Sequence, residues 1–378
     1  MLNSLLIKIT KQFPEQKKSS IKNVLIIALA ILQKETVCLN KLKTCLGAII
    51  GNKNTQADSH YKRIYRFFYE HSSGNLWLQI LKYVFQLLDL KSDYLLLDGT
   101  SWERGNKKYH YITLCIVYQS VAIPIYWKDL NKKGQSNQIE RLAFLKEACS
   151  HFRLKDKTLI ADREYIGIDW FEALVELEID FLIRIRKTDY HSLINSFSGK
   201  SHQTLTKKVL NSKKSQKAVG KTIQIKGKNI QFVIAKKEQN ATEHELVYLF
   251  STLEQPPISI ALQYQIRWKI ECCFKHLKSN GFQLENMNVQ GTDKSHLLMA
   301  MTVFAYTLSV YEGLKSYQKI TLKDYANGTS FKTTSVFRVG IAKLLILCHN
   351  LEDFAQFIHH NFLLKQKPKI FQINHFVQ

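Results

Sequence analysis

Two short apolar runs, each ending in an aspartate, constrain the fold of this 378-residue chain more than any other feature. Residues 94–97 lead into Asp98, and residues 158–161 lead into Asp162. Apolar runs of this length between polar breaks are typical of buried strands. Other segments also have regular patterns, namely strands at residues 111–118, 121–127 and 180–185 and helices at residues 138–152 and 168–177. Three strands, a helix, a strand, a helix and a strand predict a mixed α/β sheet.

The flanking segments differ in pattern from this α/β part. Residues 1–90 have helical patterns without strand-like alternation, and the chain from about residue 296 onward is mostly helical as well. Between about 188 and 254, short alternating runs with a hairpin turning at Gly227 indicate a β-rich insertion. We therefore expect three parts, which are a helical region of residues 1–90, an α/β domain of residues 91–295 that carries the insertion, and a helical region of residues 296–378.

The chain is strongly basic, with 54 Lys and Arg against 31 Asp and Glu and a formal net charge of +23. Such an excess favours a polyanionic partner, and nucleic acid is the usual one. A ribosome-associated protein and a membrane-surface protein are the alternatives that charge alone leaves open. Residues 60–69 interleave basic and aromatic side chains at helical spacing. This pattern places Lys62, Arg63 and Arg66 either on DNA or on the solvated face of an amphipathic helix.

Seven cysteines without a C-x-x-C pair or a regular spacing indicate reduced thiols in a cytoplasmic protein and give no zinc motif. Two apolar segments, residues 24–32 and 297–311, deserve comparison with membrane spans. The first is about half as long as a span needs to be, and the second is interrupted by Thr, Ser and Tyr. We expect both to be buried helices, and we expect no membrane partner.

Residues 256–280 have the pattern of one long helix that begins at Pro256-Pro257 and ends at Asn280-Gly281. At about 100° per residue, one face of this helix holds four functional side chains within an arc of roughly 60°, namely Tyr264, Arg267, Glu271 and Lys278. Apolar side chains lie opposite them, at Ile266, Ile270, Cys273 and Leu277. Taken alone, such an arc is more often a solvated face than a site.

Asp98 and Asp162 carry the stronger signal, because a carboxylate at the end of a buried strand is costly unless it is paired or binds a metal. Either aspartate taken singly is more simply a cap on the following turn. If the two strands are neighbours, however, the carboxylates lie side by side and need a cation between them. A glutamate from a helix packed on the sheet completes a hard-oxygen site suited to Mg²⁺. Two such ions can drive phosphodiester displacement.

These residues resemble the signature of a known family. Asp98-Gly-Thr, Asp162-Arg-Glu and the spacing Tyr264-x2-Arg267-x3-Glu271-x6-Lys278 are similar to the motifs of DDE transposases of the insertion-sequence-4 family, relatives of the Tn5-type enzymes. Trp268 and Ile270 match beside the key residues. The resemblance covers roughly residues 55 to 315 and extends to the segments at 123–127, 137–141 and 278–285.

The resemblance implies a ribonuclease H-like catalytic core with a β-insertion before the glutamate, and a helical N-terminal region that binds transposon ends. It implies that Asp98, Asp162 and Glu271 bind two Mg²⁺ ions, for which Mn²⁺ can substitute. Other side chains then contact DNA, namely Tyr264, Arg267, Trp268 and Lys278 near the cleaved strand, with Arg163 beside Asp162. The implied partners are double-stranded DNA, as transposon ends and target, and a second copy of the chain in a synaptic homodimer. The implied location is the bacterial cytoplasm, in association with the nucleoid.

One departure concerns the hairpin step of the Tn5-type enzymes, which stack a flipped base on a tryptophan of the β-insertion. None of the five tryptophans lies between residues 188 and 254. Either another aromatic residue of the insertion takes this role, with Tyr190, Phe197, Phe232 and Tyr248 as candidates, or the hairpin step differs in this chain. Two alternative functions remain open at this point. One is a structure-specific nuclease on the same fold, and the other is a catalytically silent DNA-binding protein or transposition inhibitor.

Overall fold

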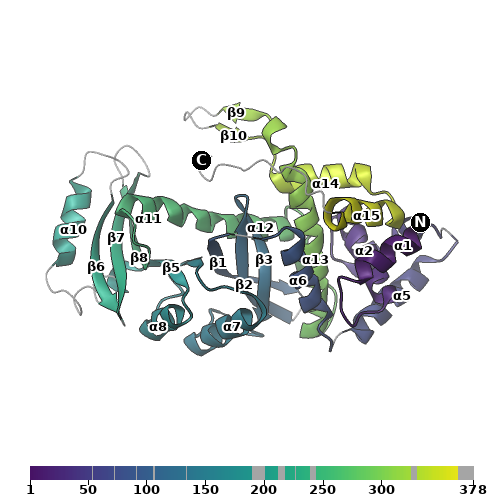
Figure 1. Ribbon diagram of the computed structural model, residues 1–378, viewed down its shortest axis with the longest axis horizontal. Helices are drawn as coiled ribbons and strands as arrows, with labels where there is room; N and C mark the ends of the chain where they lie inside the picture. The colour runs from purple at the N-terminus through teal and green to yellow at the C-terminus, as the bar shows by residue number, and fades with distance from the viewer. Residues whose placement is uncertain are drawn as a thin grey trace.

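The computed structural model describes most of the chain (Figure 1). The described residues are 1–364 without residues 53, 72, 91, 105–106, 133, 190–200, 212–217, 226, 239–243 and 325–329.

A large mixed sheet forms the centre, and its strands lie in the order β3-β2-β1-β4-β5-β8-β7-β6. Their bounds are β1 (Tyr94–Arg104), β2 (Lys107–Tyr118), β3 (Val121–Asp129), β4 (Thr158–Ala161), β5 (Asp180–Ile185), β6 (Ala218–Ile225), β7 (Lys228–Glu238) and β8 (His244–Ser251). The strands β1, β4 and β5 run parallel, while β2 pairs antiparallel with both β1 and β3. This order and these directions confirm the predicted mixed sheet of ribonuclease H-like type.

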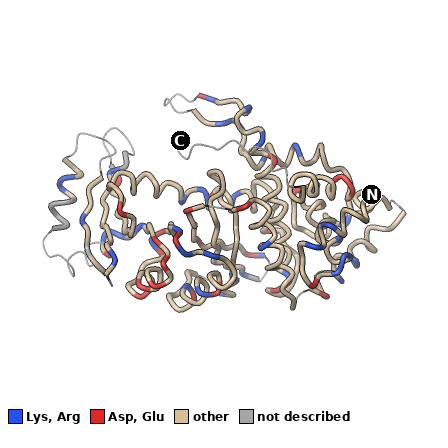
Figure 2. The backbone as a smooth tube through the Cα atoms, in the orientation of Figure 1, with Lys and Arg blue, Asp and Glu red and all other residues tan. Residues whose placement is uncertain are grey.

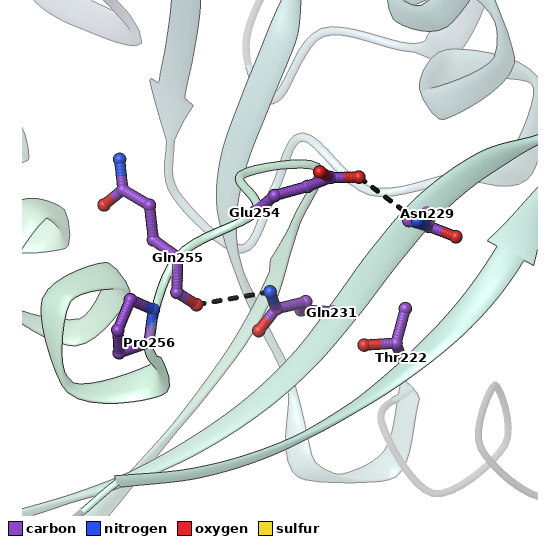
Figure 3. A pocket seen from close by; sticks show the side chains of 6 residues that line it. All are labelled: Thr222, Asn229, Gln231, Glu254, Gln255 and Pro256. Atoms are coloured by element: carbon purple, nitrogen blue, oxygen red, sulfur yellow. Dashed lines mark hydrogen bonds between the residues drawn. The ribbon is translucent and has the colours of Figure 1, made fainter.

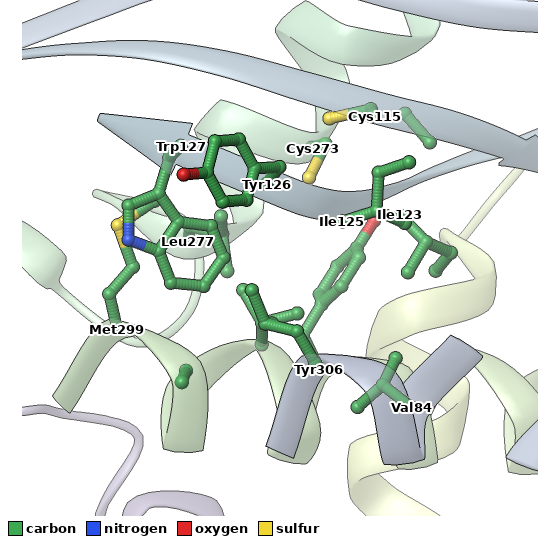
Figure 4. Close-up of a cluster of buried hydrophobic side chains, with 14 of the residues drawn as sticks. Val84, Cys115, Ile123, Ile125, Tyr126, Trp127, Cys273, Leu277, Met299 and Tyr306 are labelled. Carbon is green, nitrogen blue, oxygen red and sulfur yellow. The ribbon is translucent and has the colours of Figure 1, made fainter. Parts of the chain in front are cut away.

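Helices cover both faces of this sheet, which explains why its central strands are apolar without interruption. Leu95, Leu96 and Leu97 of β1 are fully buried, as are all four residues of β4. Helices α7 (Gln138–His151) and α8 (Ile168–Glu176) lie on one face, and α11 (Pro257–Tyr264) and α12 (Trp268–Leu277) lie on the other (Figure 1). Figure 4 shows the core beneath α12, where Cys273 and Leu277 meet side chains of β2, β3 and α13.

The β-rich insertion continues the central sheet instead of forming a separate one. Its last strand, β8, pairs antiparallel with β5, from Leu182 opposite Ser251 to Ile185 opposite Tyr248. The predicted hairpin is present as β6 and β7, and Gly227 has the positive φ of 77° that its turn requires. Helix α10 (Ser201–Leu210) packs on these two strands.

The two ends of the chain share one helical region. Its elements are α1 (Leu2–Thr10), α2 (Lys18–Lys34), α3 (Leu39–Leu42), α4 (Leu46–Ile50), α5 (Ala57–Glu70), α6 (Leu76–Leu87), α13 (Thr292–Leu314), α14 (Val336–Leu347) and α15 (Leu351–Ile358), followed by a π-helical turn (His359–Leu363). Helix α13 packs against α2, α6, α14 and β3, and α1 packs against α15. The sequence did not predict the small hairpin of β9 (Leu322–Asp324) and β10 (Ser330–Lys332), which projects from the helices in Figure 1.

Helices α13 and α14 approach so closely that glycine is required at their crossing. A Cβ atom on Gly340 would lie 1.6 Å from the Ser309 carbonyl oxygen, and one on Gly313 would lie 1.9 Å from the Val336 carbonyl oxygen. Both distances are far below van der Waals contact, so no side chain fits at either position.

Both apolar segments are buried helices, as predicted. Residues 24–32 form the buried part of α2. Within the part of the chain that the structure describes, α13 alone is long and apolar enough to cross a membrane, and its apolar stretch is entirely buried inside the protein.

Candidate active site

The two aspartates occupy neighbouring positions at one edge of the sheet. In the parallel pairing of β1 with β4, Leu97 lies opposite Ala161, and the next residues are Asp98 and Asp162. Asp162 directly follows β4, as expected, whereas β1 continues to Arg104 because it pairs with β2 beyond Asp98, so Asp98 does not end its strand. The adjacency of the two strands, on which the proposed pairing of carboxylates depends, is therefore present.

Asp98 is held inside the sheet. Its side chain is only 19% exposed, and its Oδ1 accepts a hydrogen bond of 2.8 Å from the Gly99 N–H. Burial raises the pKa of Asp98 from 3.8 to about 7, against the lowering effects of Arg267 and of the Gly99 N–H. The neighbouring carboxylates of Glu164 and Asp162 raise this pKa further. Without a cation nearby, ionising this group is costly.

Asp162 begins the turn that follows β4. Its Oδ1 accepts a hydrogen bond of 2.7 Å from the Arg163 N–H, and its carbonyl oxygen accepts one of 3.0 Å from the Tyr165 N–H. The Asp162 side chain is half-buried, and Arg163 is exposed. Asp162 therefore caps its own turn while leaving its second carboxylate oxygen for another partner.

The helix predicted at residues 256–280, which carries Tyr264, Arg267, Glu271 and Lys278, differs in detail from the sequence prediction. It is interrupted by a 3-10 turn at Gln265–Arg267, which packs against β4, and α12 ends at Leu277 instead of Asn280. The chain turns there, and a Cβ atom on Gly281 would lie 1.9 Å from the His276 carbonyl oxygen. The predicted buried face is confirmed for Ile270, Cys273 and Leu277, whereas Ile266 is only partly buried.

Arg267 joins two of the three predicted acids. Its Nη1 lies 3.2 Å from Asp98 Oδ2, and its Nη2 donates a hydrogen bond to Glu271 Oε1, one helical turn further along. The Arg267 side chain is 16% exposed and that of Glu271 is 33% exposed. One guanidinium group therefore bridges a carboxylate of β1 and a carboxylate of α12.

Tyr264 and Lys278 flank this bridge. The Tyr264 hydroxyl is buried and has no hydrogen-bond partner among the described residues, and burial raises its pKa. The Lys278 ammonium donates a hydrogen bond of 2.9 Å to the Ser101 carbonyl oxygen and lies 5.5 Å from the centre of the Trp102 ring. Burial lowers the pKa of Lys278, while Glu285 raises it. Trp268, in contrast, is 60% exposed.

Two residues that the sequence did not single out lie close to Asp98. A Cβ atom on Gly99 would meet the His110 ring at 3.5 Å and Glu164 Oε1 at 3.9 Å, so both side chains lie against the strand beside Asp98. Glu164 belongs to the Asp162-Arg-Glu motif, which could have indicated it. His110 lies on β2 opposite Ser101, and no motif indicates it.

Comparison with known proteins gives the family. Residues 90–308, more than half of the chain, match the family described as the transposase DDE domain. The chain belongs to the DDE transposases. No curated protein matches the sequence. A solved structure, "Cryo-EM structure of piggyBac transposase synaptic complex with hairpin DNA", is similar to this chain with a TM-score of 0.48 and 12% identity, over 92% of this chain and 74% of that one.

DDE transposases use divalent metal ions, and the donors at this site suit such an ion. Asp98, Asp162 and Glu271 supply carboxylate oxygens, which are the ligands that Mg²⁺ prefers. Within the described residues, no three His, Cys, Asp or Glu side chains lie close enough together to hold a metal ion as they stand. The Arg267 guanidinium nevertheless shows that Asp98 and Glu271 converge on a point where a positive charge is stable.

The N-terminal residues of this DDE transposase divide into two groups. Lys62 and Arg66 are exposed on α5, whereas the Nε of Arg63 donates a hydrogen bond of 3.0 Å to Asn23 Oδ1 of α2. Arg63 is half-buried, and its bond to Asn23 joins α5 to α2. Figure 2 shows that Lys and Arg also occur along the rest of the molecule.

The insertion of this DDE transposase offers little surface for base stacking within its described part. Phe232 is fully buried against Phe250, and Tyr248 is also buried. Tyr190 and Phe197 lie outside the described residues. An open pocket of about 380 Å³ on the insertion is lined by Thr222, Asn229, Gln231, Glu254, Gln255 and Pro256, and none of these belongs to the carboxylate site (Figure 3).

Proposed function

We propose that this DDE transposase binds the ends of its own insertion sequence, cuts the DNA and joins it to a target by phosphodiester hydrolysis and transesterification. The observation that supports this proposal is the adjacency of two acids in the sheet, together with the link of a third acid to one of them through Arg267. Asp98 lies within β1, Asp162 directly follows the neighbouring β4, and Arg267 links Glu271 of α12 to Asp98. On a solvated helix face, the arginine that pairs with Glu271 would not also pair with a buried carboxylate of the sheet.

We propose Mg²⁺ as the ion, with Asp98, Asp162 and Glu271 as its protein ligands and Mn²⁺ as a substitute. When bound, two such ions lower the pKa of a water molecule or a 3′-hydroxyl and stabilise the leaving oxygen. Different contacts hold the three proposed ligands in place. Asp98 and Asp162 are each fixed by a backbone N–H, while Glu271 is fixed by the buried face of its helix.

The cationic side chains around the acids would hold the DNA backbone. Lys278 lies at the Ser101 end of β1, and Arg267 lies between Asp98 and Glu271, so both can reach phosphates of a strand that crosses the acids. The Tyr264 hydroxyl is buried on the side of Arg267 and Asp162, and the exposed Trp268 ring offers a flat surface on which a base could stack. Lys62 and Arg66 of α5 would contact the transposon end at a greater distance from the cut.

We further propose that two copies of the chain act together, because excision of a segment requires both of its ends to be cut. A synaptic homodimer would place one transposon end in each carboxylate site. The DNA then bridges the two protomers, and the basic surface of each protomer contributes to holding it.

The test is cleavage of a labelled duplex that carries the inverted repeat flanking the reading frame. Glu271→Gln, Asp98→Asn and Asp162→Asn should each abolish nicking and strand transfer in Mg²⁺ and leave binding in EDTA intact. Glu147→Gln is the matched control, since Glu147 is an ion-paired helix glutamate of α7, on the other face of the sheet. Near wild-type nicking by Glu271→Gln would refute the assignment. Binding without any cleavage by the wild type would indicate a catalytically silent DNA-binding protein.

A further inference from the structure

The Arg267 guanidinium occupies the place between two acids that the proposed chemistry needs for a metal. It contacts Asp98 Oδ2 at 3.2 Å and Glu271 Oε1 through separate nitrogens of one planar group. A guanidinium has donors arranged in a fork and stays protonated at every physiological pH. Arg267 is therefore a permanent positive charge within the acidic site.

The acids around it explain why such a charge is required. Asp98 is buried, and the carboxylates of Glu164 and Asp162 both act on it unfavourably. Of the groups that act on Asp98, Arg267 is the one that offsets burial most strongly. Without this guanidinium, the crowded carboxylates would have to take up protons or move apart.

We propose that Arg267 is a displaceable internal counter-ion, which holds Asp98 and Glu271 together until a divalent metal replaces it and releases its guanidinium to a DNA phosphate. This inference rests on the proposed function, because it takes the same acids as metal ligands. A divalent ion shared by Asp98 and Glu271 would lie a few ångströms from the guanidinium, and repulsion between the two cations would be strong there. The guanidinium therefore leaves when the ion enters.

The surroundings of Arg267 allow this movement. Its side chain is not sealed in, since 16% of it is exposed, and the residue lies at the junction between a 3-10 turn and α12. Lys278 likewise contacts β1, where it donates a hydrogen bond to the Ser101 carbonyl oxygen. A phosphate accepts two parallel hydrogen bonds from an arginine, which gives the released group a better partner than water. Metal binding and DNA binding are thus linked.

A titration of the full chain with Mn²⁺ in the absence of DNA tests the displacement directly. The electron paramagnetic resonance signal of free Mn²⁺ measures how much of the ion is bound at each step. Arg267→Gln removes the competing cation and should tighten Mn²⁺ binding by about tenfold, equivalent to about 1.4 kcal/mol. Arg338→Gln is the matched control, because it removes an equally charged, ion-paired arginine of α14 that bonds Glu35 in the helical region and not the acids. The control should leave Mn²⁺ affinity unchanged. Equal or weaker Mn²⁺ binding by Arg267→Gln overturns the proposal.

A second measurement uses the wild-type chain and does not depend on how the variant folds. The side-chain ¹⁵Nε resonance of Arg267, identified by its loss in Arg267→Lys, should shift when Mg²⁺ is added and shift again with end DNA. A resonance that stays unchanged at saturating Mg²⁺ overturns the displacement. If Glu271→Gln fails to weaken Mn²⁺ binding, the metal site and this inference both fail. If Arg267→Gln tightens Mn²⁺ binding but the wild type cuts no DNA, only the proposed function fails.

Discussion

The buried position of Asp98 predicts an unusual pH dependence of stability in the metal-free protein. Below its folded-state pKa of about 7, Asp98 is protonated in the folded chain, whereas in the unfolded chain it ionises near 3.8. Unfolding therefore releases a proton between these two values, and the free energy of unfolding falls as pH rises through this window. The contribution of protonated Asp98 to the free energy of unfolding is fully present below pH 3.8 and is lost as pH passes about 7.

The magnitude follows from the two pKa values. At about 1.36 kcal/mol for each tenfold change in proton affinity, a rise from 3.8 to about 7 corresponds to roughly 4 kcal/mol as an upper limit. Asp98→Asn keeps the size of the side chain and removes its ionisation. The variant should therefore gain stability relative to wild type as pH rises from 5 to 8, by about 2 to 3 kcal/mol, because part of the limit lies below pH 5.

Urea unfolding in EDTA at several pH values between 5 and 8 measures this difference, and other titrating groups cancel in the comparison. Asp162→Asn is the control. It should keep most of the wild-type pH dependence, since burial and not Asp162 is the largest cause of the raised pKa of Asp98. Parallel pH profiles for wild type and Asp98→Asn would refute the reasoning.

Two further predictions concern packing and DNA contact. Gly340→Ala places a Cβ atom 1.6 Å from the Ser309 carbonyl oxygen, so α13 and α14 must separate, and urea unfolding should show a loss of about 3 kcal/mol or more. Arg63→Ala breaks a hydrogen bond to Asn23 and should cost about 1 kcal/mol of stability, whereas Arg66→Ala should leave stability unchanged, weaken binding to end DNA and reduce its salt slope by about 1. The measurements are titrations of end DNA at three salt concentrations and urea unfolding curves. Equal effects of the two variants in both assays would contradict a structural role for Arg63 and a DNA-contacting role for Arg66.

The sequence predicts the central part of the fold well because its signals are local. The runs ending in Asp98 and Asp162 are apolar throughout, as buried parallel strands must be, and this places both acids at the same edge. The helical periodicity around Glu271 likewise predicts which side of α12 is buried. Membership of the DDE transposases is confirmed, while the insertion-sequence-4 branch of the family stays a prediction.

The features that the sequence does not predict depend on long-range or unpatterned contacts. The pairing of β8 with β5 joins residues more than 60 positions apart, and no local pattern encodes it. The strands β9 and β10 are mostly exposed, so they lack the alternation of buried residues that reveals a strand. Arg63 lies at the border of the buried face of α5, where a long side chain can turn to either side.

The packing of both chain ends on α13 has a consequence for synthesis and for evolution. A ribosome delivers α1 to α6 long before residues 292–314 emerge, so the apolar surfaces that α13 covers remain without their cover for most of translation. Helices α1 and α15 are in contact although most of the chain separates them in sequence. Contacts between residues so far apart in sequence form slowly. Replacement of α2, α5 and α6 would thus expose the surface of α13 on which they pack. A different N-terminal segment would therefore require matching changes in α13.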